Sequence, residues 1–140
     1  MKILICGLPG SGKSTLSEPF AKAIGGVWLN ADAVRTKYDD WDFSYFGRAR
    51  QAKRMSLLAD GVIMAGKVAV CDFVCPKQSI RAEFAADFTV FMDTIETSEY
   101  EDTNKMFETP TDIDYHISKW FDDTHENLVN VIERFNNVRF

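Results

Sequence analysis

The feature that most constrains the fold of this chain is a glycine-rich octapeptide near its start, Gly7-Leu8-Pro9-Gly10-Ser11-Gly12-Lys13-Ser14. It fits the pattern G-x-x-x-x-G-K-[ST]. An apolar run, Lys2–Cys6, precedes it, and a segment with helical apolar spacing, Lys13–Ile24, follows it. A strand, a tight loop and a helix in that order are the context in which such a loop holds phosphate. The octapeptide therefore predicts a nucleotide-binding loop where the first strand ends.

This loop is expected to bind the phosphates of ATP, the phosphoryl donor. Its glycines let backbone N–H groups turn inward around an anion, and the helix that follows adds a positive dipole end. Lys13 is expected to reach the β- and γ-phosphates of ATP, and the Ser14 hydroxyl is expected to bind Mg²⁺. The residues predicted to bind ATP are Gly7, Pro9, Gly10, Ser11, Gly12, Lys13, Ser14 and Thr15. Kinases, hydrolases and nucleotide switches all use such a loop, so the loop alone leaves the reaction open.

The rest of the chain alternates between apolar runs and segments with helical spacing. Further strands are expected at 27–29, 67–74, 87–93 and 114–120, and further helices at 31–38, 44–66, 76–85 and 122–136. Pro19 is expected to kink or destabilise the helix that contains it. The alternation predicts an α/β fold of three layers, a P-loop NTPase fold with a mainly parallel sheet of about five strands between helices. The 140 residues fit a single domain spanning 1–140.

One long segment, 96–111, is polar and has no apolar periodicity. It is predicted to be a loop or a lid that closes over phosphates and excludes water. In such a lid, Lys105 could neutralise the charge of a transferring phosphoryl group and Phe107 could stack on a base. A disordered surface loop is the competing interpretation.

Composition narrows the class of partner. The chain has 16 Lys and Arg against 21 Asp and Glu, and this net charge of −5 argues against a nucleic-acid partner. The apolar runs are far shorter than the ~20 residues that span a bilayer, and no signal peptide is expected.

Three cysteines, Cys6, Cys71 and Cys75, lie in or beside apolar segments. Reduced, buried thiols in a cytoplasmic protein are the expectation, and a zinc site is improbable.

A charged pair follows the second expected strand. Asp32 and Arg35 are three residues apart, and on a helix they share one face. Asp32 could accept a proton from a hydroxyl group or hold Mg²⁺ through water, and Arg35 could bind an anionic group of a second substrate. A surface ion pair of little energetic weight is the alternative.

Further candidate site residues lie on one helix face and at the ends of two apolar runs. Arg48 and Gln51 share a helix face near the expected cleft, whereas Arg50, Lys53 and Arg54 are expected to face solvent. Asp72 and Asp93 each end an apolar run, the pattern of a carboxylate that holds Mg²⁺. Asp72 is the favoured metal ligand, and Asp93 is expected to cap a loop.

Several of these segments together resemble one family, the adenylylsulfate kinases (APS kinases). GLPGSGKSTL at 7–16 is similar to the GLSGAGKSTL of that family, and LNADAVR at 29–35 resembles its LDGDNVR. Phe43-Ser44 followed by Arg48, Gln51 and Arg54 resembles FS….R..N..R. FVCP at 73–76 resembles FISP, and FMDT at 91–94 resembles FVDT. The similarity runs from about residue 2 to residue 94 and more weakly to residue 120.

The resemblance implies an activity and a set of roles. The implied reaction is phosphorylation of the 3′-hydroxyl of adenosine 5′-phosphosulfate (APS) by MgATP to give PAPS, a step of sulfate assimilation. Lys13 and Asp32 would be catalytic, and members of the family are often homodimers. The positions that match substrate-binding residues of the family are Arg35, Phe43, Arg48, Gln51, Cys75 and, by a looser alignment, Lys105 and Phe107.

The chain also departs from the family pattern. Asn30 replaces the first Asp of DGD, Asp72 replaces an apolar or small residue, and Glu101-Asp102 replaces the usual Arg-Asp of the lid. The phosphoryl-donor site is intact, while the acceptor stays open. The alternatives are a kinase for another anionic nucleotide or phosphorylated metabolite, a P-loop ATPase or switch, and a nucleic-acid end kinase, which the net charge disfavours.

Overall fold

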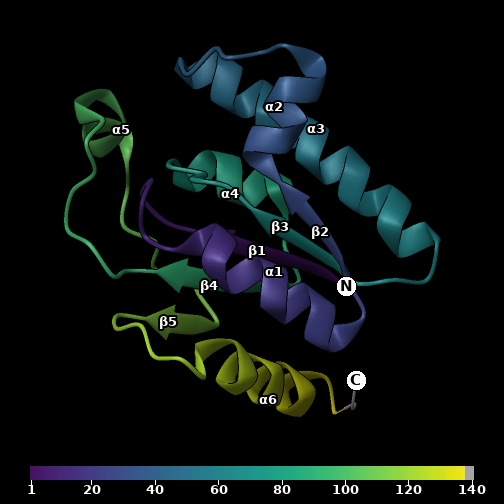
Figure 1. The fold of residues 1–140 in the computed structure, drawn as a ribbon. Coiled ribbons are helices and arrows are strands. Elements are labelled where there is room, and N and C mark those ends of the chain that lie inside the picture. Colours follow the sequence, from purple (N-terminus) through teal and green to yellow (C-terminus); the bar gives the residue numbers. More distant parts are fainter. Residues whose placement is uncertain (138–140) are drawn as a thin grey trace.

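Within residues 1–137, which the structure describes, five strands form one sheet in which every neighbouring pair is parallel (Figure 1). The structure is a computed structural model. The strands are β1 (Lys2–Cys6), β2 (Val27–Asn30), β3 (Ala69–Asp72), β4 (Phe88–Met92) and β5 (Tyr115–Ile117). Their order across the sheet is β2-β3-β1-β4-β5, so the first strand lies in the centre.

Six helices within the same described residues connect and cover these strands (Figure 1). They are α1 (Lys13–Ile24), α2 (Ala31–Tyr38), α3 (Tyr45–Met64), α4 (Gln78–Phe84), α5 (Glu101–Met106) and α6 (Thr124–Asn136). Strand β1 shows why the sheet is covered on both faces, because successive side chains of a strand point to opposite faces. Ile3 and Ile5 pack in a core cluster with residues of α1 and α6, and Leu4 and Cys6 pack in a second cluster with residues of α3 and α4.

The expected α/β fold with a parallel sheet between helices is confirmed. The structure gives shorter strands than the apolar runs indicate, since 67–74 contributes only Ala69–Asp72. The described part of the expected domain ends at residue 137, so 138–140 lie outside it. Among the described residues no helix is long and apolar enough to cross a membrane.

Helix α1 contains Pro19 and still runs without interruption from Lys13 to Ile24, so the proline does not end the helix. Leu16 and Phe20 are fully buried on either side of the proline, and this packing outweighs the backbone hydrogen bond that proline cannot donate. The polar segment 96–111 is not wholly irregular, since it contains α5, whose first turn carries Glu101 and Asp102 next to the positive end of the helix dipole.

The three cysteines are free and buried, as expected. Burial raises the pKa of Cys6 to about 11 and that of Cys71 to about 12, and it raises the pKa of Cys75 further. A thiol must lose its proton to act as a nucleophile or a metal ligand. These three side chains are therefore neutral parts of the core.

Candidate active site

The phosphate loop between β1 and α1 depends on three glycines with positive φ. Gly7, Gly10 and Gly12 have φ values of 154°, 85° and 100°. A Cβ atom on Gly7 would lie 2.5 Å from the carbonyl oxygen of Met92, so no larger residue fits there. The loop therefore passes close to the end of β4 and presents its backbone at the carboxyl edge of the sheet, the edge at which open α/β sheets bind ligands.

Lys13 lies at the mouth of this loop. Its side chain is buried, and its ammonium group donates a hydrogen bond to the carbonyl oxygen of Leu8 at 3.0 Å. Burial lowers the pKa of Lys13, and the nearby charges of Asp72 and Asp32 oppose that shift. A phosphate on the loop would offer this ammonium group a stronger, charge-assisted partner than the carbonyl oxygen.

Three polar side chains connect the start of α1 with the ends of β2 and β3. The Asn30 amide nitrogen donates to Ser14 Oγ at 3.1 Å and to Asp72 Oδ1 at 3.2 Å. The Asn30 amide oxygen accepts from the backbone N–H of Ala33 at 3.0 Å, which caps α2. Because this cap identifies the oxygen, the amide nitrogen must face Ser14 and Asp72. The Ser14 hydroxyl and the Asp72 carboxylate thus lie on either side of one amide group.

Asp72 is almost fully buried at the end of β3. Burial raises the pKa of its carboxyl group, whereas hydrogen bonds from Trp28 and Asn30 and the charge of Lys13 lower it. The other candidate, Asp93, binds His116 Nε2 at 2.8 Å and does not line the cavity. Of the two carboxylates that end apolar runs, only Asp72 is placed near Ser14.

The residues expected to bind the acceptor begin on α2. Asp32 is exposed in the first turn of this helix and lines the cavity. Arg35 is buried one turn later, and its guanidinium group donates to the carbonyl oxygens of Asp40 and Asp42 at 2.9 and 3.2 Å. Within residues 1–137 no ion pair joins Asp32 to Arg35, so the surface-pair interpretation is wrong.

A second arginine reaches the same place from α3. Arg48 is buried and donates to the Phe43 carbonyl oxygen at 2.9 Å and to Thr103 Oγ1 at 2.7 Å. The guanidinium carbons of Arg35 and Arg48 lie 4.4 and 5.3 Å from the centre of the Phe43 ring. Burial lowers the pKa of both arginines, yet an arginine pKa is so high that both stay cationic. The cavity therefore contains two fixed positive charges beside a half-exposed aromatic ring.

Gln51 and Cys75 shape the cavity rather than offer free polar groups to it. The buried Gln51 amide nitrogen donates to the Ala31 carbonyl oxygen at 3.0 Å, and its oxygen accepts from Arg54. This bond holds α3 against the start of α2. Cys75 lines the cavity but is only 2% exposed, and its backbone has a φ of 45°.

Of the three basic residues on α3 that were expected to face solvent, Arg50, Lys53 and Arg54, not all do so. Lys53 is exposed, as expected. Arg54 instead donates to Asp40 Oδ2 at 2.8 Å with only 16% of its side chain exposed, and Arg50 donates to the same carboxylate at 2.7 Å. The interpretation of Arg54 as a solvated residue is therefore wrong. Together these bonds fix the loop between α2 and α3, which carries Phe43.

The lid segment contributes different residues from those expected. Tyr100, Thr103 and Met106 line the cavity, together with Glu99, Glu101 and Asp102. The structure does not bring Lys105 and Phe107 to it. Lys105 is exposed, and the Phe107 ring stacks on Phe91 in the core, 6.0 Å between ring centres.

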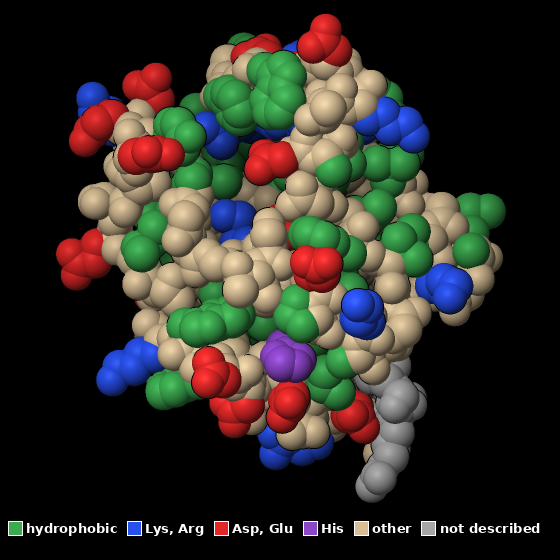
Figure 2. All heavy atoms as spheres, viewed as in Figure 1, with side chains coloured by type: hydrophobic (Ala, Val, Ile, Leu, Met, Phe, Trp, Pro, Cys, Tyr) green, Lys and Arg blue, Asp and Glu red, His purple; other side chains and the backbone are tan. Residues whose placement is uncertain are grey.

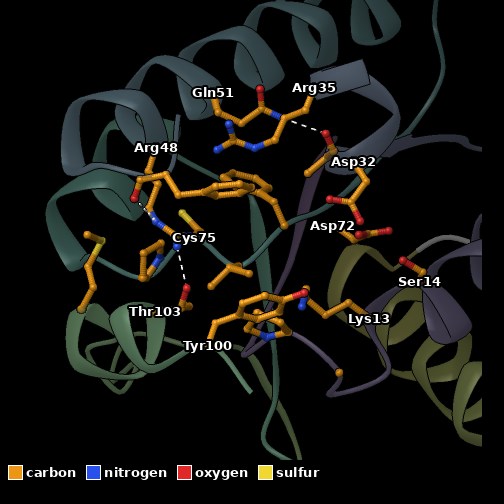
Figure 3. Close-up of a pocket in the computed structure, with 18 of the residues that line it drawn as sticks. Lys13, Ser14, Asp32, Arg35, Arg48, Gln51, Asp72, Cys75, Tyr100 and Thr103 are labelled. Carbon is orange, nitrogen blue, oxygen red and sulfur yellow. Dashed lines mark hydrogen bonds between the residues drawn. The ribbon is translucent and has the colours of Figure 1, made fainter. Parts of the chain in front are cut away.

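Most of the residues expected at the ATP and acceptor sites line one cavity of about 1460 Å³. Gly7 and Ser11 of the phosphate loop are not among its lining residues. Single ligand pockets usually measure about 300–1,000 Å³, so this cavity has room for two substrates. Figure 2 shows the hollow, with basic side chains recessed in it and acidic side chains around its rim. Figure 3 shows side chains from β3, the phosphate loop, α2, α3 and α5 directed into a common space, among them Lys13, Ser14, Asp32, Arg35, Arg48, Asp72 and Tyr100.

The site fits Mg²⁺ bound together with a nucleotide rather than a metal held by protein alone. Among residues 1–137, no group of three or more His, Cys, Asp or Glu side chains is arranged to hold a metal ion. Mg²⁺ in nucleotide sites takes one or two protein oxygen ligands, with phosphates and water supplying the rest. Ser14 and Asp72 provide such oxygen atoms, held on either side of the Asn30 amide.

The sequence interpretation missed Trp28, Tyr100 and Thr103. The position of Trp28 near the site could have been predicted, because it lies two residues before Asn30 and so on the same face of the strand. Tyr100 and Thr103 had none, since only the path of the chain between β4 and β5 brings them to the cavity.

The fold and the loop define a P-loop nucleotide-binding protein. The family model of the AAA domain matches residues 3–91, which is more than half of the chain, and the chain belongs to this family. None of the curated proteins matches the sequence.

Solved structures show the same fold at low sequence identity. The APS kinase of Mycobacterium tuberculosis in complex with AMPPNP and APS is similar with a TM-score of 0.80 and 20% identity, over 94% of this chain and 96% of that one. A gluconokinase from Sinorhizobium meliloti 1021 has a TM-score of 0.66 at 15% identity, over 97% and 93%. The shikimate kinase of Aquifex aeolicus has a TM-score of 0.68 at 13% identity, over 98% and 99%. One fold serves many substrates, so these likenesses establish the architecture and leave the acceptor to the chemistry of the cavity.

Proposed function

We propose that this protein is an ATP-dependent phosphotransferase that transfers the γ-phosphoryl group of MgATP to a hydroxyl group of an anionic nucleotide. The preferred acceptor is the 3′-hydroxyl of adenosine 5′-phosphosulfate. The observation that carries the proposal is the single cavity in which the phosphate loop faces Asp32, Arg35, Arg48 and Phe43. The fold shared with APS kinase, gluconokinase and shikimate kinase structures supports the reaction class.

The donor end holds the triphosphate. Backbone N–H groups of the loop and the Lys13 ammonium group bind the β- and γ-phosphates. Ser14 and Asp72 would hold Mg²⁺, which, when bound, neutralises the charge that develops between these phosphates. The lid residues around Tyr100 reduce access of water, which would otherwise compete as the acceptor.

The acceptor end supplies the attacking hydroxyl group. Asp32 accepts the hydroxyl proton while the hydroxyl oxygen forms a bond to the γ-phosphorus and the bond from that phosphorus to the bridging oxygen of ADP breaks. Arg35 and Arg48 bind the anionic group of the acceptor, and the exposed face of Phe43 stacks on its base. The remaining N–H groups of both guanidinium groups are the donors for this contact, because Arg35 and Arg48 already use others to hold the chain in place.

The test is transfer of phosphate from MgATP to APS, followed as phosphorylated product together with ADP. Lys13→Ala and Asp32→Ala are expected to abolish transfer, and Arg35→Ala is expected to raise the KM for the acceptor. Loss of two charge-assisted contacts at an anion costs about 3 kcal/mol, roughly a hundredfold. The exposed residues Glu83 and Lys53, each replaced by Ala, are the matched controls. Near-normal turnover by folded Asp32→Ala would refute the assigned role, and ADP release without phosphorylated product would exclude APS as the acceptor.

A kinase for another small hydroxyl compound is the second candidate. Glu99, Glu101 and Asp102 of the lid line the same cavity as the two arginines. Carboxylates accept hydrogen bonds from hydroxyl groups and disfavour further negative charge. A panel of anionic nucleotides and polyhydroxy acids such as gluconate and shikimate, each incubated with MgATP, would separate the two candidates by which compound is phosphorylated.

A further inference from the structure

Trp28 lies on the same face of the sheet as the residues of the proposed metal site. It precedes Asn30 by two positions on β2, and Val70 precedes Asp72 by two positions on β3. The register pairs Trp28 with Val70 and Asn30 with Asp72. Side chains two apart on a strand share a face, so Trp28, Asn30 and Asp72 lie together on the side covered by α1.

The indole group of Trp28 contacts the buried carboxylate directly. Its Nε1–H donates to Asp72 Oδ2. The Asn30 amide nitrogen lies nearer Oδ1, at 3.2 Å, and reaches Oδ2 only at 3.4 Å. Asp72 is 2% exposed, so water contributes little to its orientation. A carboxylate has about four acceptor positions. The two donors leave at least one of these positions free. The Ser14 hydroxyl oxygen lies 3.1 Å from the same Asn30 amide nitrogen.

Trp28 makes the shorter contact to Oδ2 and Asn30 makes its shorter contact to Oδ1, so the two donors together fix the plane of the carboxylate. Without the indole N–H, Oδ2 would keep only the long contact to Asn30. The Trp28 ring is itself held, because it packs against the core cluster that contains Leu16 and Phe20 of α1. The indole N–H is therefore a rigid donor, and its position is set by core packing rather than by the ligand.

We propose that Trp28 is a positioning residue that orients the Asp72 carboxylate toward Ser14 and thereby sets the affinity of the nucleotide site for Mg²⁺. The inference rests on the proposed function, because it assumes that this site binds ATP with Mg²⁺. Groups that orient a metal ligand typically change metal affinity by about 10–100-fold when they are removed.

The test measures equilibrium binding of ATP at graded Mg²⁺ concentrations, so it needs no acceptor and no turnover. Trp28→Phe keeps an aromatic ring in the core but removes the N–H donor. It is expected to raise the Mg²⁺ concentration for half-maximal ATP binding about tenfold. ATP affinity measured with EDTA should be unchanged. Asp72→Asn should shift the Mg²⁺ dependence at least as far, and Trp28→Phe in the Asp72→Asn background should add little, since the indole acts through this carboxylate.

The matched control is Tyr115→Phe. Tyr115 is also an aromatic residue that packs against the same cluster, but it lies on β5 at the far edge of the sheet. Tyr115→Phe removes a polar atom far from the site, so the Mg²⁺ concentration for half-maximal ATP binding should be as in the wild type. If Trp28→Phe does not fold by circular dichroism, Trp28→Met removes the same donor and carries the test.

The outcomes separate the two claims. Wild-type Mg²⁺ dependence in folded Trp28→Phe, or additive effects of the two substitutions, would overturn the inference alone. An unchanged Mg²⁺ dependence in Asp72→Asn would overturn it as well. A wild-type protein that binds no ATP at any Mg²⁺ concentration would overturn the proposed function and the inference with it.

Discussion

At the scale of single residues, the hydroxyl of Ser11 stands out in the phosphate loop. Ser11 is 3% exposed, and among the described residues its Oγ is the one buried side-chain nitrogen or oxygen without a hydrogen-bond partner. A buried hydroxyl without a partner costs about 1–3 kcal/mol. The loop therefore carries a polar group that does not stabilise the fold.

Replacement of this serine by alanine is expected to stabilise the protein. Ser11→Ala removes the unpaired oxygen and keeps Cβ, so the free energy of unfolding should rise by about 1 kcal/mol in urea denaturation. Ser17→Ala is the matched control, because the equally buried Ser17 hydroxyl donates to the Lys13 carbonyl oxygen at 2.6 Å. That variant should lose about 1 kcal/mol. A loss in both variants would show that Ser11 has a partner.

At the scale of elements, α1 keeps its form despite the proline in its interior. Pro19 has no N–H, so the Thr15 carbonyl oxygen lacks its helical partner. Pro19→Ala restores this hydrogen bond, which stabilises the folded state. It also gives the unfolded chain more conformational freedom, which offsets part of that gain. The expected net result is a gain of about 1–2 kcal/mol in the free energy of unfolding, measured by urea denaturation. A less stable Pro19→Ala would mean that the proline ring contributes packing that alanine cannot replace.

The loop between α2 and α3 should make stability depend on pH. Hydrogen bonds from Arg50 and Arg54 hold the pKa of Asp40 well below its ordinary range. A carboxyl group whose pKa is lower in the folded state stabilises the fold above its unfolded pKa, about 3.9. That contribution is lost as the pH falls through the lower, folded pKa.

Asp40→Asn is therefore expected to melt at a lower temperature than the wild type at pH 7. The difference should narrow progressively below about pH 4, where the unfolded wild-type carboxyl group also takes up a proton. Thermal melting followed by circular dichroism from pH 7 to pH 2.5 measures both effects. Asp112→Asn, at an exposed position, should show no such pH-dependent difference. A difference for Asp40→Asn that stays constant with pH would argue against this ion-pair explanation.

The helices and strands themselves could largely be predicted because their signals are local. The apolar run of β1 and the apolar stripe of α6 are readable within a dozen residues. Helix α5 was missed because its six residues, Glu101–Met106, carry no apolar periodicity. That α1 continues through Pro19 could not be predicted from the sequence, because burial of Leu16 and Phe20 is a property of the packed helix.

At the scale of the whole molecule, one buried arginine joins the segment 96–111, the expected lid, to the rest of the fold. Arg81 on α4 donates to the carbonyl oxygens of Cys75, Pro76 and Glu108. The backbone N–H of Glu108 in turn donates to the Pro76 carbonyl oxygen at 2.7 Å. The segment that returns from α5 to β5 is thereby joined to the loop that follows β3.

Loss of this arginine should loosen the lid as well as the core. Arg81→Met leaves three carbonyl oxygens without the guanidinium donor, so the free energy of unfolding should fall by about 3 kcal/mol or more in urea denaturation. In limited proteolysis, the segment 94–114 should be cleaved faster in Arg81→Met than in the wild type. Arg134→Met on the exposed side of α6 should change neither measurement. Unchanged proteolysis in Arg81→Met would mean that other contacts hold the lid.

The chain by itself determined the phosphate loop and the α/β class. Their physical basis is local, since the glycines, Lys13 and Ser14 act within one strand, one turn and the start of one helix. Only the tertiary structure decided the strand order and the contacts made across it. Trp28 reaches Asp72 across 44 positions of sequence, and Arg48 reaches Thr103 across 55. Whether such distant groups meet depends on how the sheet and its connections pack, and Lys105 and Phe107 were placed elsewhere for the same reason.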